Sequence, residues 1–147
     1  MGASDIEDNI SDDDYLIRRI SPSKPGWDTI AKNKDGTFRA SSSSMSTRPN
    51  EEHLSCSLLK VTKPQDLLDQ LKDQGIEPDG WNVALFKVGD ARALGLEISL
   101  DKTDSDEGHC LLKAEGGLDY PKIAGKKIAK KTRILNADEI ADPESIE

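Results

Sequence analysis

Two histidines and two cysteines are the residues whose types could hold a metal ion. His53 lies three residues before Cys56, and His109 directly precedes Cys110. Imidazole and thiolate are ligands that zinc prefers. In an extended strand, however, His53 and Cys56 point to opposite faces, as do His109 and Cys110. A metal site could use only one residue of each pair without a bulge, so we expect no metal and predict no cofactor.

The same cysteines are candidate nucleophiles. A cysteine nucleophile needs a lowered pKa and a base within reach. His109 is the chain neighbour of Cys110, but neighbours in a strand diverge, and contact between Cys56 and His109 requires their strands to be adjacent. Both cysteines lie in apolar runs, which favours buried thiols that act as small hydrophobic residues.

A serine-rich segment between two arginines is a candidate anion-binding loop. Arg39 precedes the run 41–46, and Arg48 follows it. Hydroxyl groups and loop N–H groups can hold a phosphate when a guanidinium lies near. We therefore take Arg39, Ser42, Ser44 and Arg48 as candidate anion ligands, with a flexible polar loop as the alternative interpretation.

An arginine, a Ser-x-Ser segment and a glutamate occur in an order that resembles that of ADP-ribosyltransferases. The resemblance implies that the arginine holds a phosphate of NAD or a related substrate, that the serines shape the nicotinamide pocket, and that the glutamate stabilises an oxocarbenium charge. The residues concerned are Arg18 or Arg19, Ser55 and Ser57, and Glu97 or Glu115.

Two other features could bind a partner protein. Trp27 follows a segment with two prolines and a glycine, which could present the indole on a stiff loop. A basic segment near the C-terminus carries Lys126, Lys127 and Lys130 and no acidic residue between 122 and 133. A solvated helix face is the alternative interpretation of these lysines. Trp81, which opens an expected strand, is better explained as a core residue.

The elements that must position these residues indicate one α+β domain with a largely antiparallel sheet and two or three helices. Thr62 and Gln65 are spaced as a capping box at the start of the clearest helix. Residues 96–100 and 109–114 alternate as the strands of a hairpin. Strands are expected at 15–20, 37–40, 54–61, 81–88, 96–100, 109–114 and 132–135, and helices at 62–74, 90–94 and 121–131.

Composition and charge narrow the class of protein. The chain has 147 residues and a net charge of -8, which argues against broad nucleic-acid binding and leaves the basic helix as the one route to it. Residues 1–14 read as an acidic arm, 15–135 as the domain and 136–147 as an acidic tail, and we expect both acidic ends to be disordered. The acidic start is unlike a signal peptide, no apolar run is long enough to span a membrane, and two cysteines are no disulfide framework. These features favour the cytoplasm.

Several segments resemble a group of small, uncharacterised bacterial cytoplasmic proteins. The resemblance implies a bacterial type of protein and brings no activity with it. The segments are 15–20 (YLIRRI), 39–46 (RASSSSMS), 52–58 (EHLSCSL), 89–96 (GDARALGL) and 108–112 (GHCLL).

Because no firm catalytic motif is present, the sequence favours a small cytoplasmic binding or accessory module without enzymatic activity. Its expected partner is a protein, which could be encoded in the same operon. The alternative is a nucleotide-utilising enzyme of the ADP-ribosyltransferase type, acting on NAD or another phosphate-containing substrate.

Overall fold

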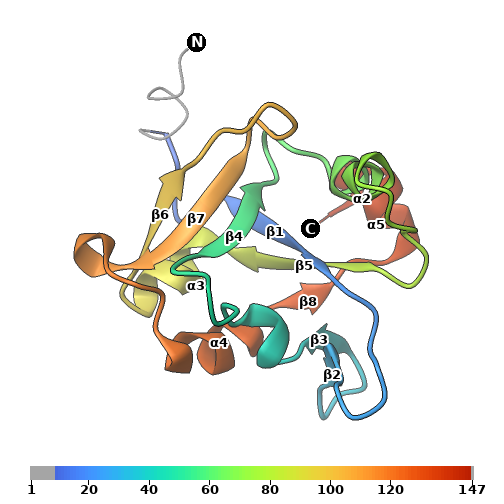
Figure 1. Ribbon diagram of the computed structural model, residues 1–147, viewed down its shortest axis with the longest axis horizontal. Coiled ribbons are helices and arrows are strands. Elements are labelled where there is room, and N and C mark those ends of the chain that lie inside the picture. Colours follow the sequence, from blue (N-terminus) through green and yellow to red (C-terminus); the bar gives the residue numbers. More distant parts are fainter. Residues whose placement is uncertain (1–8, 147) are drawn as a thin grey trace.

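The computed structural model describes residues 9–146, and its centre is a six-stranded antiparallel sheet (Figure 1). The strands are β1 Tyr15–Ile20, β2 Ile30–Lys32, β3 Phe38–Ala40, β4 Leu54–Leu58, β5 Asn82–Lys87, β6 Leu96–Leu100, β7 His109–Ala114 and β8 Arg133–Ile134. Their order in the large sheet is β6-β7-β4-β1-β5-β8, and β2 and β3 form a separate hairpin. The predicted α+β class with a largely antiparallel sheet is confirmed.

Four α-helices and three short 3-10 turns complete the described part of the chain. Helix α2 buries Leu67 and Leu71, which lie one turn apart, and it ends before Gly75, whose φ of 76° suits a residue without a side chain. The elements are η1 Ser43–Met45, α2 Pro64–Asp73, α3 Val88–Ala93, η2 Glu115–Gly117, α4 Lys122–Ala129, α5 Ala137–Ala141 and η3 Pro143–Ser145.

Two hydrophobic cores lie on opposite faces of the sheet. Alternate residues of β1 divide between them, since Leu16 and Ile20 belong to the larger core and Ile17 to the smaller one. Turn η1 and helices α3 and α4 cover the larger core, whereas α2 and α5 cover the smaller one and lie side by side (Figure 1).

The predicted capping box at Thr62 is wrong. Helix α2 begins at Pro64 with Lys63 at its N-cap, and no side chain caps it. The Thr62 hydroxyl instead donates to the carboxylate of Asp106, which lies far away in the sequence. A local spacing rule could not anticipate this competing partner.

The acidic arm predicted for residues 1–14 is ordered in the part that the structure describes. Residues 1–8 lie outside the described residues, but Ile10 packs in the larger core. Asp12 pairs with Arg92 at 2.7 Å, and Asp14 pairs with Lys60 at 2.8 Å. Although burial would raise the pKa of Asp14, the hydrogen bond from Lys60 holds it below its usual value.

The disordered acidic tail predicted for residues 136–147 is also wrong over the described residues. Asn136 and Glu139 form a capping box that starts α5. Glu139 is buried and pairs with Arg133 at 2.7 Å. Ile140 and Ile146 pack against the smaller core. The segment is therefore the fourth helix of the domain and a cover for one face of the sheet.

The two central strands, β1 and β4, pair over a short distance only. Their register pairs are Leu16 with Leu58 and Ile17 with Ser57, whereas β1 pairs with β5 along all of its 6 residues. Beyond Ile17 the two strands separate, and the sheet is split at its middle.

Candidate anion-binding site

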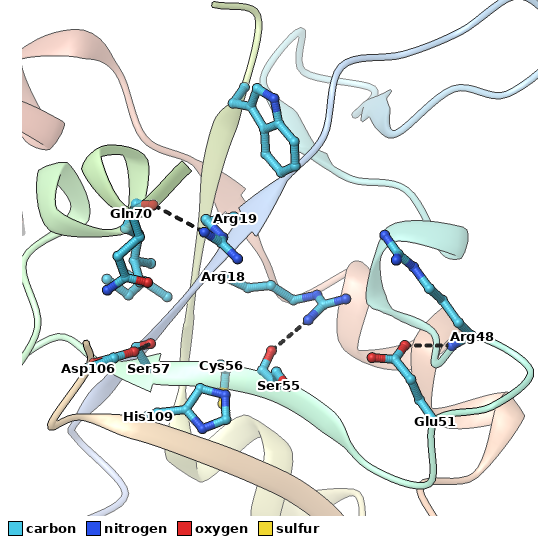
Figure 2. Close-up of a pocket in the computed structure, with 13 residues that line it drawn as sticks. Arg18, Arg19, Arg48, Glu51, Ser55, Cys56, Ser57, Gln70, Asp106 and His109 are labelled. Atoms are coloured by element: carbon cyan, nitrogen blue, oxygen red, sulfur yellow. Dashed lines mark hydrogen bonds between the residues drawn. The ribbon is translucent and has the colours of Figure 1, made fainter. Parts of the chain in front are cut away.

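A cleft of about 280 Å³ lies where β1 and β4 separate, and Figure 2 shows the side chains that line it. The N–H of Leu59 donates to the C=O of Tyr15 at 3.0 Å, and hydrogen-bonded rungs recur at every second residue of an antiparallel pair. Arg19 and Ser55 would form the first rung that is missing. Their main-chain groups therefore face the cleft, where the C=O of Ser55 accepts a hydrogen bond from Nη1 of Arg18 at 2.6 Å.

Arg18 spans the gap between the separated strands. Its Nε donates to the C=O of Ser44 at 3.0 Å, in addition to the bond to Ser55. No carboxylate among residues 9–146 forms an ion pair with this guanidinium. Burial lowers the pKa of Arg18, against the opposing effect of neighbours that include Cys56 and Glu51. The cleft thus holds a partly buried cation without a bonded counter-ion.

Two further arginines line the same cleft. Nη1 of Arg19 contacts the C=O of Leu67 at 3.4 Å, and burial lowers its pKa against the opposing charge of Asp106. Arg48 lies at the exposed rim, where its main-chain N–H donates to Oε1 of Glu51 at 2.8 Å. Within the described part of the chain neither guanidinium has a carboxylate partner. Three arginines therefore line one cleft. Arg18 and Arg19 reach it from adjacent positions of β1, and Arg48 reaches it from the loop before β4.

The carboxylate of Asp106 is fixed by hydrogen bonds at one end of the cleft. This buried group accepts from the hydroxyls of Ser57 and Thr62 and from the N–H of Gly108 at 3.0 Å. Because these donors hold the negative charge in place, it does not swing across to pair with Arg19. The Ser57 hydroxyl is thus already engaged in a hydrogen bond to Asp106.

His109 lines the cleft from β7, opposite Ser57 of β4. Its Nδ1 lies 3.0 Å from the C=O and 3.2 Å from Oδ2 of Asp101. Asp101 therefore fixes the orientation of the imidazole, which offers its remaining nitrogen as a further polar group.

A second cavity of about 310 Å³ adjoins the arginine cleft. Both cavities are lined by Arg18, Arg19, Arg48 and Trp81, and Trp27 lines the second one. The predicted partner-binding residue Trp27 is thus part of the wall of this continuous depression.

The residues of the ADP-ribosyltransferase-like set do not all meet in one place. Arg19, Ser55 and Ser57 line the cleft, as expected for neighbours on the same face of adjacent strands. Glu97 and Glu115 instead line a different cavity at the edge strand β6. The glutamate assignment is therefore wrong, since β7 and β4 stand between β6 and β1.

The candidate anion loop reaches the cleft with only part of its residues. Arg48 lines the cleft, and Ser44 gives its carbonyl to Arg18. Arg39 does not reach it, because its guanidinium bonds the adjacent C=O of Ala40 at 3.3 Å. Ser42 is exposed and accepts from the Ser46 hydroxyl through its carbonyl.

The histidines and cysteines do not gather into a metal site. Among residues 9–146 no group of three or more His, Cys, Asp or Glu could hold an ion. Cys56 and Cys110 face each other across β4 and β7 within the larger core, and His109 lies in the cleft. His53 keeps a buried Nδ1 that has no hydrogen-bond partner among the residues that the structure describes. Burial raises the pKa of the Cys56 thiol well above its usual value, which disfavours the thiolate.

Of the three lysines named as partner-binding candidates, Lys126 and Lys127 lie on α4 and Lys130 directly follows it, all away from the cleft. Lys126, Lys127 and Lys130 are all exposed. None of them forms an ion pair with another described residue. Gly125 on the opposite side of the helix packs closely against Met45 of η1, so the basic face points to solvent.

Sequence reasoning missed several residues of the cleft, namely Glu51, Gln70, Trp81 and Asp106, and it preferred Arg19 to Arg18. One signal was available for Arg18. Side chains of a strand point alternately to its two faces, so Arg18 shares a face with Leu16 and Ile20. An arginine therefore occupies a position where a core residue is usually apolar.

Comparison with known proteins gives the chain no relative. No family model, no curated protein and no solved structure matches it. No helix within residues 9–146 combines the length and the apolar character that a membrane crossing requires. The function is therefore inferred from the chemistry of the cleft.

Proposed function

We propose that the protein binds a small phosphate-bearing anion in the cleft between β1 and β4. The observation that carries the proposal is Arg18, a partly buried guanidinium bonded to two carbonyls and, among residues 9–146, to no carboxylate. Removing a charge from water is costly unless an opposite charge compensates it. Arg19 and Arg48 add two more such groups in the same cleft.

Phosphate is the anion that suits these donors best. A guanidinium presents a planar fork of N–H groups that matches two oxygens of a phosphate. The missing rung between β1 and β4 adds main-chain N–H groups of Arg19 and Ser55, which suit anionic oxygens. The two carboxylates of the cleft, Glu51 and Asp106, already accept hydrogen bonds from the protein itself. These carboxylates keep their charge, but the three arginines of the cleft outnumber them, so an entering anion meets a net positive lining.

We favour binding over catalysis for this site. The Ser57 hydroxyl donates to Asp106, and the Cys56 thiol belongs to the core and resists ionisation. A binding or accessory role in the cytoplasm is the function that these features support. The burial of both cysteines in the core suits the unpaired thiols of a reducing compartment.

Calorimetric titration of the full chain with pyrophosphate at low ionic strength tests the proposal. Replacing Arg48 by Gln should weaken binding about tenfold, because one charge-assisted hydrogen bond is lost. The matched control is Arg39→Gln, at the other end of the same loop, which should bind as the wild type does. The proposal is overturned if millimolar pyrophosphate gives no binding heat, or if the two variants lose affinity equally.

The exposed face of α4 supports a second function, which is contact with a partner protein. Ile123 is 63% exposed, and Lys126 and Lys127 on the same helix and Lys130 directly after it lack ion pairs within the described residues. An apolar side chain within a basic surface suits an acidic partner. Co-expression with the products of adjacent genes, comparing Lys126→Glu/Lys127→Glu with Lys32→Glu/Lys34→Glu, should show loss of co-purification in the first variant only. Equal co-purification with both variants would refute this role for α4.

A further inference from the structure

The cavity beside the arginine cleft has an aromatic wall. Trp27 and Trp81 are the two tryptophans of the chain, and both line this cavity. Trp81 also lines the arginine cleft, so the aromatic wall and the cationic wall belong to one depression. Each cavity alone is near the lower limit of ligand pockets, roughly 300 Å³, and together they suit a larger molecule.

Trp27 is held in place although it is exposed. Its side chain is 52% exposed, yet its Nε1 donates to the Ser43 hydroxyl at 2.8 Å. Its main chain exchanges two hydrogen bonds with Lys24, at 2.8 and 3.0 Å, across a Pro25-Gly26 turn. Proline fixes its own φ, and Gly26 has the positive φ of 78° that type II turns require at this position. A large apolar ring is thus fixed at the surface instead of being packed into the core.

Trp81 is positioned by a turn as well. The main-chain N–H of Trp81 donates to the C=O of Pro78 at 3.1 Å. Asn82, directly after it, starts β5, which pairs with β1. The main chain of Trp81 is therefore joined to the strand pair that carries Arg18 and Arg19, and Trp81 lines both cavities together with these two arginines.

We infer that the ligand is a nucleotide, whose base stacks on the tryptophan wall while its phosphate binds the three arginines. The inference rests on the proposed function, because it needs the phosphate site. Every nucleobase offers a flat π face that stacks on indole, and a nucleotide joins this face to an anionic group through one sugar. Inorganic phosphate alone would leave the fixed tryptophan ring without a role.

Titration with matched ligands separates the two parts of the site. The probes are pyrophosphate, ribose 5-phosphate and the four mononucleotides AMP, GMP, CMP and UMP, each added to the full chain in the calorimeter. AMP and ribose 5-phosphate differ by the base alone, so base stacking predicts that at least one mononucleotide binds about tenfold tighter than ribose 5-phosphate.

Variants of Trp27 test whether the aromatic wall causes the difference in affinity between a mononucleotide and ribose 5-phosphate. Trp27→Ala should reduce nucleotide affinity to that of ribose 5-phosphate and leave pyrophosphate affinity unchanged, whereas Trp27→Phe keeps a ring and should retain most of the difference. The control is Phe38→Ala, because Phe38 has the same 52% exposure and lines neither cavity. Circular dichroism of each variant shows whether it is folded.

The outcomes distinguish the inference from the proposed function. If pyrophosphate does not bind, the phosphate site and the proposed function are wrong. If pyrophosphate binds but no mononucleotide binds tighter than ribose 5-phosphate, the nucleotide inference is overturned and the phosphate site stands. Equal loss of nucleotide affinity in Trp27→Ala and Phe38→Ala would also overturn it.

Discussion

Arg18 shows how one side chain sets the chemistry of the cleft. Alternation along β1 gives it the same face as Leu16 and Ile20, so it begins among core residues and ends in the gap. Its bond to the C=O of Ser55 replaces part of the sheet ladder that β1 and β4 do not form, and its bond to the C=O of Ser44 joins β1 to η1. Under the proposed function, a bound anion would offset the cost of burying this charge, so the stability of the protein would depend on whether the cleft is occupied.

Replacing Arg18 by Met tests this connection. Pyrophosphate at one hundred times its dissociation constant should stabilise the wild type by about 2.7 kcal/mol, because ligand binding to the folded state alone shifts the unfolding equilibrium. Arg18→Met should lose this gain, since methionine fills the space but offers no charge. Thermal unfolding followed by circular dichroism, with and without pyrophosphate, measures the stabilisation of the wild type and of Arg18→Met. An equal stabilisation of the variant would show that Arg18 has no part in binding.

The sequence named part of the cleft and missed the rest. Arg19, Ser55 and Ser57 were named because their order resembles that of ADP-ribosyltransferases, and they line one cleft because β1 and β4 are adjacent in the sheet. Glu97 was wrong because its distance from the cleft depends on the position of β6 in the sheet order. Asp106 was missed because it lies in an acidic turn whose composition resembles solvent-exposed loops.

Helix α5 illustrates, at the level of an element, how composition can conceal structure. The acidic residues after 135 suggested a tail, but Asn136 and Glu139 already had the spacing of a capping box. Ile140 supplies an apolar contact to the smaller core. The strands were predicted more completely, because their alternation extends over several residues and is less affected by a few charges.

The ion pair between Glu139 and Arg133 should make α5 sensitive to acid. The hydrogen bond from Arg133 holds the pKa of Glu139 below its usual value of 4.5, against the effect of burial. A lowered pKa in the folded state stabilises the protein above the usual value, and this stability is lost as the pH falls through the lowered pKa. At pH 7, Glu139→Gln should reduce the free energy of unfolding by about 0.5–1 kcal/mol.

Urea denaturation at a series of pH values measures this effect. The difference between wild type and Glu139→Gln should narrow as the pH falls below 4.5. Glutamine still serves the capping box, so the comparison isolates the charge. Glu144→Gln, a neutralisation at an exposed position nearby, is the control and should change little. A difference that is independent of pH would contradict the role of the ion pair.

The whole molecule is larger than the domain that the sequence outlined. Segments on both sides of the predicted boundaries, residues 9–14 and 137–146, add apolar contacts to the cores. The sequence assigned them to acidic ends because charges dominate their composition, while Ile10 in the first segment and Ile140 and Ile146 in the second pack against the cores. These long-range contacts join both ends of the described chain to the central sheet.

Ile10 provides the test of this larger folded unit. Ile10 is 7% exposed, so Ile10→Ala should reduce the free energy of unfolding by about 2 kcal/mol or more through lost burial and a cavity. The same substitution at Ile123, which is 63% exposed, should change it by less than about 0.5 kcal/mol. Urea denaturation monitors both variants. Equal effects would mean that the segment before β1 does not contribute to the core.

The separation of β1 and β4 divides the sheet into two halves that few main-chain pairs connect. The three strands β6-β7-β4 and the three strands β1-β5-β8 form two half-sheets, joined along a seam by the pairs of Leu16 with Leu58 and Ile17 with Ser57. An anion held by Arg19 on one side and by main-chain groups of Ser55 on the other would replace the rungs that the backbone lacks. Amide hydrogen exchange of the residues where β1 and β4 meet should then slow on binding, because the ligand would connect two half-sheets that only two register pairs join.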